Sequence, residues 1–360
     1  MIMSKYTNLI DLDDMSSEQW LKIIKLAADI SENPSKYSKV CEGKIMATLF
    51  YEPSTRTQIS FQTAMLRLGG TIIGFDNPAT SSVAKGENLK DTTKIVSSYA
   101  DIMVMRHPME GAAKAAALTA DCPIINAGDG SHLHPTQALT DMLTIYKEKG
   151  RLSNLTIGLC GDLKNGRTVH SMCKALSDFQ GIKFVFISTP ELGMSAYIKD
   201  ILKVKNCEFT ENPVLENAIG GLDILYMTRV QKERFSSEDE YLSLKDAYCL
   251  DRRKLSKGKN DLIVLHPLPR VDEIPMDVDD DPRALYFKQA KNGVYVRMAL
   301  VMSILESPNA STPLLKGEVY PDFRCQNPAC ITQKEDYLPK SFTGTEDMCV
   351  CEYCDARSLR

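Results

Sequence analysis

The chain has 360 residues, which suggests two domains with room for a small third one. Its formal net charge of −4 argues against bulk binding to nucleic acid or to an anionic membrane. Its apolar and charged fractions are those of an ordinary globular protein. No run approaches the ~18 apolar residues of a membrane span, and the first residues do not form a signal peptide. We therefore expect a cytoplasmic protein whose eleven cysteines are mostly reduced.

Short apolar runs alternate with amphipathic segments along most of the chain. A helix is predicted over residues 16–30, where Ser16 and Gln19 have capping-box spacing, and another over residues 58–68. Buried strands are predicted at 44–51, 70–75, 102–105, 123–126, 156–160, 183–187, 224–227 and 262–265. This alternation predicts an α/β fold of two doubly wound domains, each with a parallel sheet covered by helices on both faces.

The peptide Ser54-Thr55-Arg56-Thr57 follows the first predicted strand and opens the second predicted helix. A helix N-terminus offers unpaired N–H groups and the positive end of a dipole, so it binds anions. Three hydroxyls and a guanidinium at this place favour a phosphate site. The alternative is that Ser54 or Thr55 only caps the helix, which leaves Arg56 without a reason.

More chemistry-bearing residues follow other predicted strands. Arg106, His134, Arg167 and Arg229 each come shortly after a strand, where open α/β sheets place their ligands. Arginine forks match phosphate and carboxylate groups, so an interdomain cleft lined by them should bind two polyanionic substrates. Paired acids, a Ser/His/Asp triad and a reactive-cysteine motif are not evident. The implied chemistry is polarisation of an electrophile and positioning, without a covalent intermediate or a cofactor.

Five of the cysteines are concentrated near the end of the chain, behind a segment, residues 307–320, with the composition of a linker. Cys325 and Cys330 form one close pair and Cys351 and Cys354 another, with 20 residues between the pairs. This spacing predicts a structural zinc ion, one per chain, held by four thiolates, with Cys349 as an alternative to Cys351. Such a short segment needs the metal in order to fold.

Four motifs occur in an order that resembles the signature of the catalytic chains of the aspartate carbamoyltransferase family. They are Tyr51-Glu52-Pro53-Ser54-Thr55-Arg56-Thr57, His134-Pro135-Thr136-Gln137, Tyr226-Met227-Thr228-Arg229-Val230-Gln231 and His266-Pro267-Leu268-Pro269-Arg270. The resemblance runs from about Leu9 to Leu305. It implies transfer of a carbamoyl group from carbamoyl phosphate to L-aspartate, giving N-carbamoyl-L-aspartate and phosphate early in de novo pyrimidine biosynthesis.

The resemblance also implies a role for each matching residue. Thr57, Arg106 and His134 would be catalytic, polarising the carbamoyl carbonyl. The full substrate-binding set would be Ser54, Thr55, Arg56, Thr57, Ser81, Lys85, Arg106, His134, Gln137, Arg167, Arg229, Gln231, Leu268 and Pro269. Ser81, with Ser82 as an ambiguous neighbour, and Lys85 would reach in from the adjacent subunit of a homotrimer, although residues 80–87 alone resemble a surface turn. The Leu268-Pro269 bond would be cis, and Glu52, Arg167 and Arg234 would form ion pairs that hold the two domains closed.

The cysteine-rich segment resembles the zinc domain of the family's separate regulatory chain, which docks on catalytic chains and links their trimers. The implied organisation is a carbamoyl-phosphate-binding domain (1–145 with 290–306), an aspartate-binding domain (146–289), a linker (307–320) and a zinc-binding domain (321–360). We expect the zinc-binding domain to dock on a catalytic chain, with a larger assembly as an option.

Two other functions stay open at this point. One is a catalytically idle, zinc-bearing assembly subunit, and the other is carbamoyl transfer to a different amino acid. Ornithine carbamoyltransferases share the phosphate motif but have His-Cys-Leu-Pro where this chain has His266-Pro267-Leu268-Pro269. The missing cysteine and the presence of Arg229-Val230-Gln231 argue against ornithine.

Overall fold

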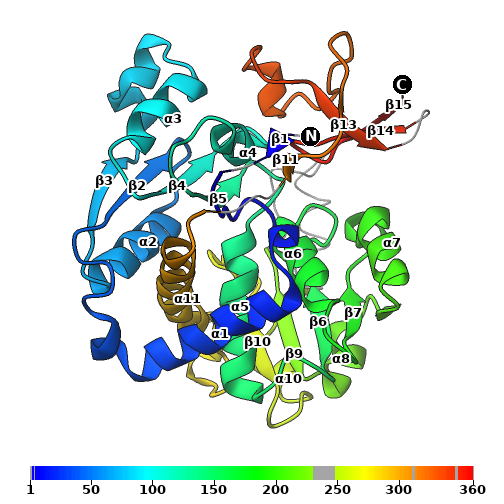
Figure 1. The fold of residues 1–360 in the computed structure, drawn as a ribbon. Helices are drawn as coiled ribbons and strands as arrows, with labels where there is room; N and C mark the ends of the chain where they lie inside the picture. Colours follow the sequence, from blue (N-terminus) through cyan, green and yellow to red (C-terminus); the bar gives the residue numbers. More distant parts are fainter. Residues whose placement is uncertain (1, 4, 230–247, 310–312, 345–347, 360) are drawn as a thin grey trace. The chain divides into compact units, whose positions relative to one another are not determined.

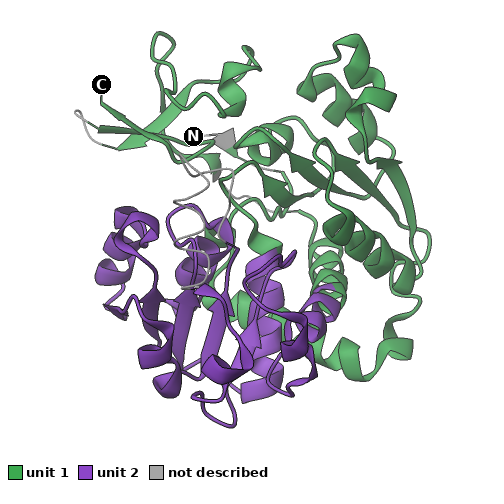
Figure 2. Ribbon diagram, turned by 180° about the vertical axis from the view of Figure 1, so that it is seen from behind, with its two compact units in different colours: residues 1–136, 294–360 green, residues 137–293 purple. Residues whose placement is uncertain are grey.

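The computed structural model describes residues 2–3, 5–229, 248–309, 313–344 and 348–359. They form two compact units, Met1–Thr136 with Val294–Arg360 (unit 1) and Gln137–Gly293 (unit 2), coloured separately in Figure 2. Each unit contains a parallel sheet, as the alternating pattern predicts. In the described part of the chain, every helix is too short or too polar to cross a membrane.

Unit 1 is built on a four-stranded parallel sheet (Figure 1). Its strands, in spatial order, are β3 (Thr71–Phe75), β2 (Ile45–Phe50), β4 (Ile102–His107) and β5 (Ile124–Asp129). Its helices are α1 (Ser17–Glu32), α2 (Thr55–Arg67), α3 (Leu89–Ser97) and α4 (Ala112–Ala117). Nearly every side chain of β2, β4 and β5 is buried, which is why these strands read as continuous apolar runs.

For two helices of unit 1, the start predicted from local sequence can be compared with the start in the structure. Ser16 caps α1 and forms the predicted capping box with Gln19. The amphipathic segment 58–68 buries Phe61, Ala64 and Met65, and α2 begins at Thr55, within the peptide 54–57 that was expected to open this helix. The apolar period is absent from Thr55-Arg56-Thr57, so periodicity alone could not detect this first turn.

Unit 2 contains a five-stranded parallel sheet. Its strands, in spatial order, are β10 (Ile263–Leu265), β9 (Ile224–Met227), β6 (Thr156–Cys160), β7 (Lys183–Ile187) and β8 (Glu208–Glu211). Its helices are α6 (Arg167–Leu176), α7 (Ala196–Val204), α8 (Leu215–Ala218) and α10 (Arg252–Leu255). The division between the units falls within α5 (Pro135–Lys149) and within α11 (Tyr286–Glu306).

The C-terminal segment of unit 1 forms an antiparallel sheet of β12 (Glu318–Val319), β13 (Ser341–Gly344), β14 (Met348–Cys351) and β15 (Arg357–Leu359). The expected linker contains two short strands, since β12 joins this sheet and β11 (Pro313–Leu315) pairs with β1 (Ile2–Met3). These strands were not predicted because two or three residues are too few to show a period of two.

Short 3-10 helices complete the described elements. They are η1 (Leu12–Asp14), η2 (Pro34–Tyr37), η3 (Pro78–Thr80), η4 (Ser82–Lys85), η5 (Pro190–Leu192), η6 (Ile219–Gly221), η9 (Met276–Asp280) and η10 (Ile331–Gln333). The cysteine-rich segment packs on α4, with which it shares a hydrophobic core (Figure 1). A methyl group added to Gly111, the N-cap of α4, would lie 2.5 Å from Cβ of Tyr353, so the two backbones approach closely.

Candidate functional site

The first group of predicted site residues lies where β2 ends and α2 begins. Ser54 is the N-cap of α2 by position, but its side chain makes no capping hydrogen bond. Its hydroxyl instead donates to Oγ1 of Thr57 at 3.0 Å. Thr55 and Arg56 are exposed and Thr57 is buried. The simple capping interpretation is therefore not what the geometry shows, and the amides of the first turn remain suited to an anion.

Arg106 is the fifth residue of β4 and lies beside Phe50 of β2 in the parallel register. Only 6% of it is exposed. Nη1 donates to the carbonyl of Ala127 at 3.3 Å, Nη2 lies 3.2 Å from Oε2 of Glu52, and Nε has no hydrogen-bond partner among the described residues. Burial lowers the pKa of this guanidinium, and the Glu52 charge opposes that shift. A buried cation with an unused donor is suited to an anionic ligand.

His134 lies between β5 and α5 and is buried. Its Nδ1 is 3.4 Å from Oγ1 of Thr136. Both His134 and Arg106 lie close to the backbone of Gly128. A methyl group added there would lie 2.7 Å from Nη1 of Arg106 and 3.6 Å from Cδ2 of His134. Gly128 also has a φ of 120°, which L side chains rarely adopt. The structure thus brings Arg106 and His134 against one stretch of backbone.

Ser81 and Lys85 lie in the two short turns η3 and η4. The Ser81 hydroxyl donates to the carbonyl of Pro78 at 2.8 Å and accepts from the N–H of Val83 at 3.3 Å. Lys85 is exposed. The turn is therefore held by its own hydrogen bonds, and it presents the lysine to solvent within one chain.

The predicted residues of unit 2 gather at one edge of its sheet. Arg167 is the first residue of α6 after β6, Arg229 follows β9, and Leu268-Pro269 follows β10. These three strands are neighbours and parallel, so their carboxyl ends meet at the same edge. Gln137, in α5, donates from Nε2 to Oδ1 of Asp141 at 2.7 Å. Gln231 and Arg234 lie outside the described residues.

The backbone at Leu268 is held by a histidine that sequence reasoning did not place in the site. Nδ1 of His266 accepts the N–H of Leu268 at 2.8 Å, so Nε2 carries the proton and lies 2.8 Å from Oε1 of Glu273. Burial raises the pKa of Glu273, but the interactions with His266 and the backbone N–H groups that the carboxylate accepts together outweigh it, and the net shift is downward. The Leu268-Pro269 bond is cis and Leu268 has a φ of 55°. The signal available in the sequence was His266, which opens the motif.

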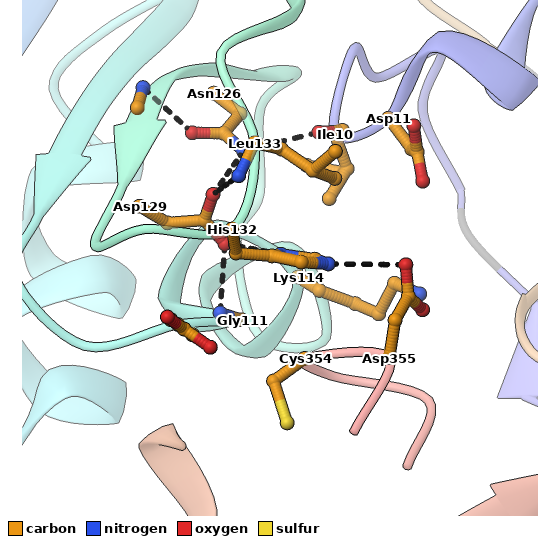
Figure 3. A network of polar contacts seen from close by, with 12 residues as sticks. Ile10, Asp11, Gly111, Lys114, Asn126, Asp129, His132, Leu133, Cys354 and Asp355 are labelled. Atoms are coloured by element: carbon orange, nitrogen blue, oxygen red, sulfur yellow. Dashed lines mark hydrogen bonds and ion pairs between the residues drawn. The ribbon is translucent and has the colours of Figure 1, made fainter. Parts of the chain in front are cut away.

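The second network not predicted from sequence surrounds Asp129, at the end of β5, and is drawn in Figure 3. His132 lies between the carboxylates of Asp129 and Asp355, with 3.1 Å from Nδ1 to the first and 3.1 Å from Nε2 to the second. Burial lowers the pKa of His132, but the two carboxylates outweigh it and raise the pKa to about 10. This imidazole is therefore cationic at neutral pH and donates from both nitrogens.

Four cysteines of the C-terminal segment form one cluster. The sulfurs of Cys325, Cys330, Cys351 and Cys354 all lie within 4.8 Å of one another, and Cys349 is not among them. Cys325 and Cys354 are 3.5 Å apart and Cys330 and Cys351 are 3.8 Å apart, which fits the edges of about 3.8 Å expected for tetrahedral Zn–S bonds of about 2.3 Å. The donor set and its spacing therefore fit a zinc ion.

The electrostatics of the cluster also fit a cation. The other three thiols hydrogen-bond to the Cys330 sulfur and hold its pKa well below the usual range. The pKa values of Cys325 and Cys351 are raised, chiefly by hydrogen bonds with Cys330 and Cys325 respectively. Four thiolates cannot ionise together at this distance without a positive charge between them.

Three family models match the chain. "Aspartate/ornithine carbamoyltransferase, carbamoyl-P binding domain" matches residues 7–147, and "Aspartate/ornithine carbamoyltransferase, Asp/Orn binding domain" matches residues 153–304. "Aspartate carbamoyltransferase regulatory chain, metal binding domain" matches residues 317–358. Together they account for most of the chain and separate the C-terminal segment from the rest.

Curated relatives and solved structures agree. The aspartate carbamoyltransferase catalytic subunit of Clostridium novyi (strain NT) is 60% identical over 298 residues, which is 83% of this chain and 97% of that protein. The catalytic subunit of M. jannaschii aspartate transcarbamoylase has 48% identity and a TM-score of 0.80, covering 83% of this chain and 98% of that one. The Trypanosoma cruzi enzyme, solved in complex with carbamoyl phosphate and aspartate, has 37% identity and a TM-score of 0.78, covering 83% and 95%. The chain therefore belongs to the aspartate carbamoyltransferase family and carries, in the same polypeptide, a metal-binding domain of the regulatory-chain type.

Proposed function

We propose that the protein catalyses transfer of a carbamoyl group from carbamoyl phosphate to the amine of L-aspartate. The nitrogen–carbon bond forms, the bond from the carbamoyl carbon to the phosphate oxygen breaks, phosphate leaves, and the amine loses a proton. The observation that carries the proposal is Arg106, a buried guanidinium whose Nε has no hydrogen-bond partner among the described residues. Its ion-pair partner Glu52 lies two residues before Ser54, the N-cap position of α2, where the side chain makes no capping hydrogen bond. Such a pairing of donors suits a phosphate group attached to a carbonyl carbon.

The residues of unit 1 would hold carbamoyl phosphate. In this proposal the α2 N-terminus with Ser54, Thr55, Arg56 and Thr57 binds the phosphate group. Thr57, Arg106 and His134 donate to the carbamoyl oxygen and stabilise the negative charge that develops on it. The contact of Gly128 with both Arg106 and His134 supports a shared role for these two side chains.

The residues of unit 2 would hold the acceptor. Arg167 and Arg229, at neighbouring strand ends, match the two carboxylates of aspartate, and Gln231 belongs to the same proposed set. Gln137 would orient the carbamoyl amide, and the backbone of Leu268 and Pro269 would face the incoming amine. The hydrogen bond between His266 and the Leu268 N–H supports this last role, because it fixes the backbone there.

Assembly, compartment and pathway belong to the same proposal. We expect a cytoplasmic homotrimer acting in pyrimidine biosynthesis, in which Ser81 and Lys85 complete the site of a neighbouring subunit. The exposure of Lys85 in a self-contained turn supports that arrangement. For the four-cysteine cluster we propose a structural zinc ion, which would hold the two cysteine pairs together and take no part in the transfer. The domain boundaries at 145, 290, 307 and 321 remain predictions.

The direct test measures transfer of radiolabelled carbamoyl phosphate to L-aspartate and to L-ornithine in competition. We expect labelled carbamoyl aspartate only, and tight binding of N-(phosphonacetyl)-L-aspartic acid. Arg56→Ala should lower both activity and binding of this inhibitor at least tenfold, whereas Arg67→Ala, an exposed arginine in the last turn of the same helix, should change neither. Labelled citrulline would identify the other acceptor, and no binding of the inhibitor would indicate an idle subunit.

A further inference from the structure

The starting point is the way the Asp129 carboxylate organises the turn before His134. Asp129 is 1% exposed. Its carboxylate accepts the N–H groups of Gly111 at 2.7 Å and Leu133 at 3.1 Å, and Nδ2 of Asn126 at 3.1 Å (Figure 3). Three donors from three different positions therefore fix one carboxylate, and the turn that follows it is built around that anion.

His132 is the fourth group on this carboxylate, and it links the turn to the metal-binding domain. Its two nitrogens reach Asp129 and Asp355, and only 12% of its side chain is exposed. Asp355 directly follows Cys354, one of the four clustered cysteines. Two residues separated by 223 positions along the chain are thus joined next to the predicted metal ion.

The metal-binding domain also contacts other parts of unit 1. Glu110 pairs with residues 329 to 331 through its backbone N–H and carbonyl, at 2.8 and 2.9 Å. Lys114 donates from Nζ to the carbonyl of Glu352 at 2.5 Å, and Glu335 accepts the N–H of Leu89 at 3.1 Å. These contacts attach the domain to α3, to α4 and to the segment after β4. Glu110 also reaches the turn, because its carboxylate accepts the N–H of Ser131 at 3.3 Å and Nδ2 of Asn327 at 2.6 Å. Lys114 and Glu335 make no hydrogen bond to residues 128–134 among the described residues, so the His132 bridge is separable from the docking contacts of these two side chains.

The turn matters for the proposed site because Arg106 and His134 pack against it at Gly128. A displacement of this backbone moves the surface on which both side chains rest. Misplacement of a catalytic group by about 1 Å can cost on the order of 100-fold in rate. Holding the turn from outside would keep the two donors aligned.

We propose that His132 is a positioning residue, which bridges Asp129 to Asp355 so that the docked metal-binding domain holds the turn 128–134 in the geometry that binds carbamoyl phosphate. The inference rests on the proposed function for the roles of Arg106 and His134. It assigns to the metal-binding domain a part in the active site of its own chain, in addition to any part in assembly.

The test is a double-mutant cycle between His132 and Asp355. Asp355 has a φ of 58°, so Asp355→Gly removes the carboxylate without backbone strain. We expect His132→Asn and Asp355→Gly each to raise the KM for carbamoyl phosphate about fivefold to twentyfold, and the double variant to be no worse than either single one. Asp355→Asn keeps an acceptor for Nε2 and should restore part of the affinity. Additive effects in the double variant would overturn the bridge.

A matched control separates the bridge from docking. Lys114→Met removes a hydrogen bond to the same domain without touching the turn, and we expect it to leave the KM for carbamoyl phosphate near the wild-type value. Bound metal, measured by atomic emission, should stay at one per chain in all variants. An equal rise of the KM in Lys114→Met would show a general docking effect and refute the specific role of His132.

Amide hydrogen exchange gives a readout that does not depend on activity. Peptides covering residues 128–134 should exchange faster in His132→Asn and Asp355→Gly than in Lys114→Met. Unchanged exchange in the two bridge variants would overturn the inference. If the wild-type protein transferred no carbamoyl group, the proposed function would fail, while the exchange result would still report whether His132 holds the turn.

Discussion

The Oε2 atom of Glu52 lies 3.2 Å from Nη2 of Arg106, so the buried guanidinium of the proposed phosphate site is paired with a carboxylate of its own chain. The Glu52 side chain is 38% exposed, whereas that of Arg106 is 8% exposed. The carboxylate can therefore turn toward solvent more readily than the arginine can. An arriving phosphate group would compete with Glu52 for the same cation.

Removal of that competitor should strengthen the binding of a simple anion. We expect Glu52→Gln to bind inorganic phosphate about threefold to tenfold more tightly, measured by calorimetry, because a partly exposed ion pair is a modest competitor. Glu42→Gln, an exposed acid before β2, is the matched control and should bind phosphate as the wild type does. Weaker phosphate binding in Glu52→Gln would mean that Glu52 supports the site and does not compete.

The stability of the protein should fall in mild acid through His107, at the end of β4. Burial, reinforced by the charge of Lys334, lowers the pKa of His107 to about 4. Its Nδ1 accepts the N–H of Met109 at 3.0 Å, which requires the neutral ring. The unfolded chain has a pKa near 6.5 and binds the proton first, so the stabilisation is complete above about pH 6.5 and is lost as the pH falls toward 4.

Denaturant unfolding of wild type and His107→Asn between pH 4 and 7.5 measures this loss. The free energy of unfolding of the wild type should decline by on the order of 3 kcal/mol more than that of the variant over this range. Asparagine keeps an acceptor for the Met109 N–H, so the variant should fold. Parallel pH profiles for the two proteins would assign the acid sensitivity to other groups.

Metal removal should act through the cluster and not through cysteines in general. The Cys351→Ser variant should lose the bound metal, because three thiolates hold the ion more weakly than four. The melting temperature of unit 1 should fall with it, since metal binding contributes to the stability of the fold. Cys349→Ser is the matched control, since Cys349 is buried in the same strand, β14, but lies outside the cluster. Calorimetry and zinc analysis of both variants provide the comparison, and metal retention by Cys351→Ser would contradict the assigned ligand set.

The assembly can be read from the molar mass of the zinc-loaded protein. Light scattering during size exclusion should give about 120 kDa, which is three chains of 40.1 kDa, if the metal-binding domain acts within one trimer. A value of twice that or more would mean that trimers are joined.

Mixing the Lys85→Ala and Arg56→Ala proteins should restore activity if subunits share sites. No recovery after proven subunit exchange would count against sharing.

The sequence allowed the sheets to be predicted well because their strands are short, apolar and bounded by turns. Residues 156–160, 183–187 and 224–227 were predicted with the bounds that the structure shows. β8 was not predicted, because Glu-Phe-Thr-Glu is a mostly exposed edge strand without an apolar run. The strand predicted at 70–75 is present as β3, but the prediction that it is buried was wrong, because it lies at the edge of its sheet and is mostly exposed. An apolar run therefore indicates a strand more reliably than it indicates burial.

Some features of the candidate site could be predicted from local sequence and others could not. Local motifs indicated Arg106 and His134, since each follows a predicted strand, although the structure places Arg106 within β4. The ion pair of Glu52 with Arg106 and the contact of His132 with Asp355 carry no local pattern, because their partners are distant in the sequence. The contacts of Gly128 with Arg106 and His134 required coordinates.

The alanines of α4 form an apolar face that shares one hydrophobic core with Tyr353, Phe342 and the clustered cysteines. Both α4 and the metal-binding domain contribute side chains to that core. Cutting the chain after α11 would expose the alanine face on one fragment and the Tyr353 side on the other, and both would tend to aggregate. The metal-binding domain therefore cannot be fused to another protein by itself. Such a fusion would also need the alanine face of α4 to cover the Tyr353 side of the domain.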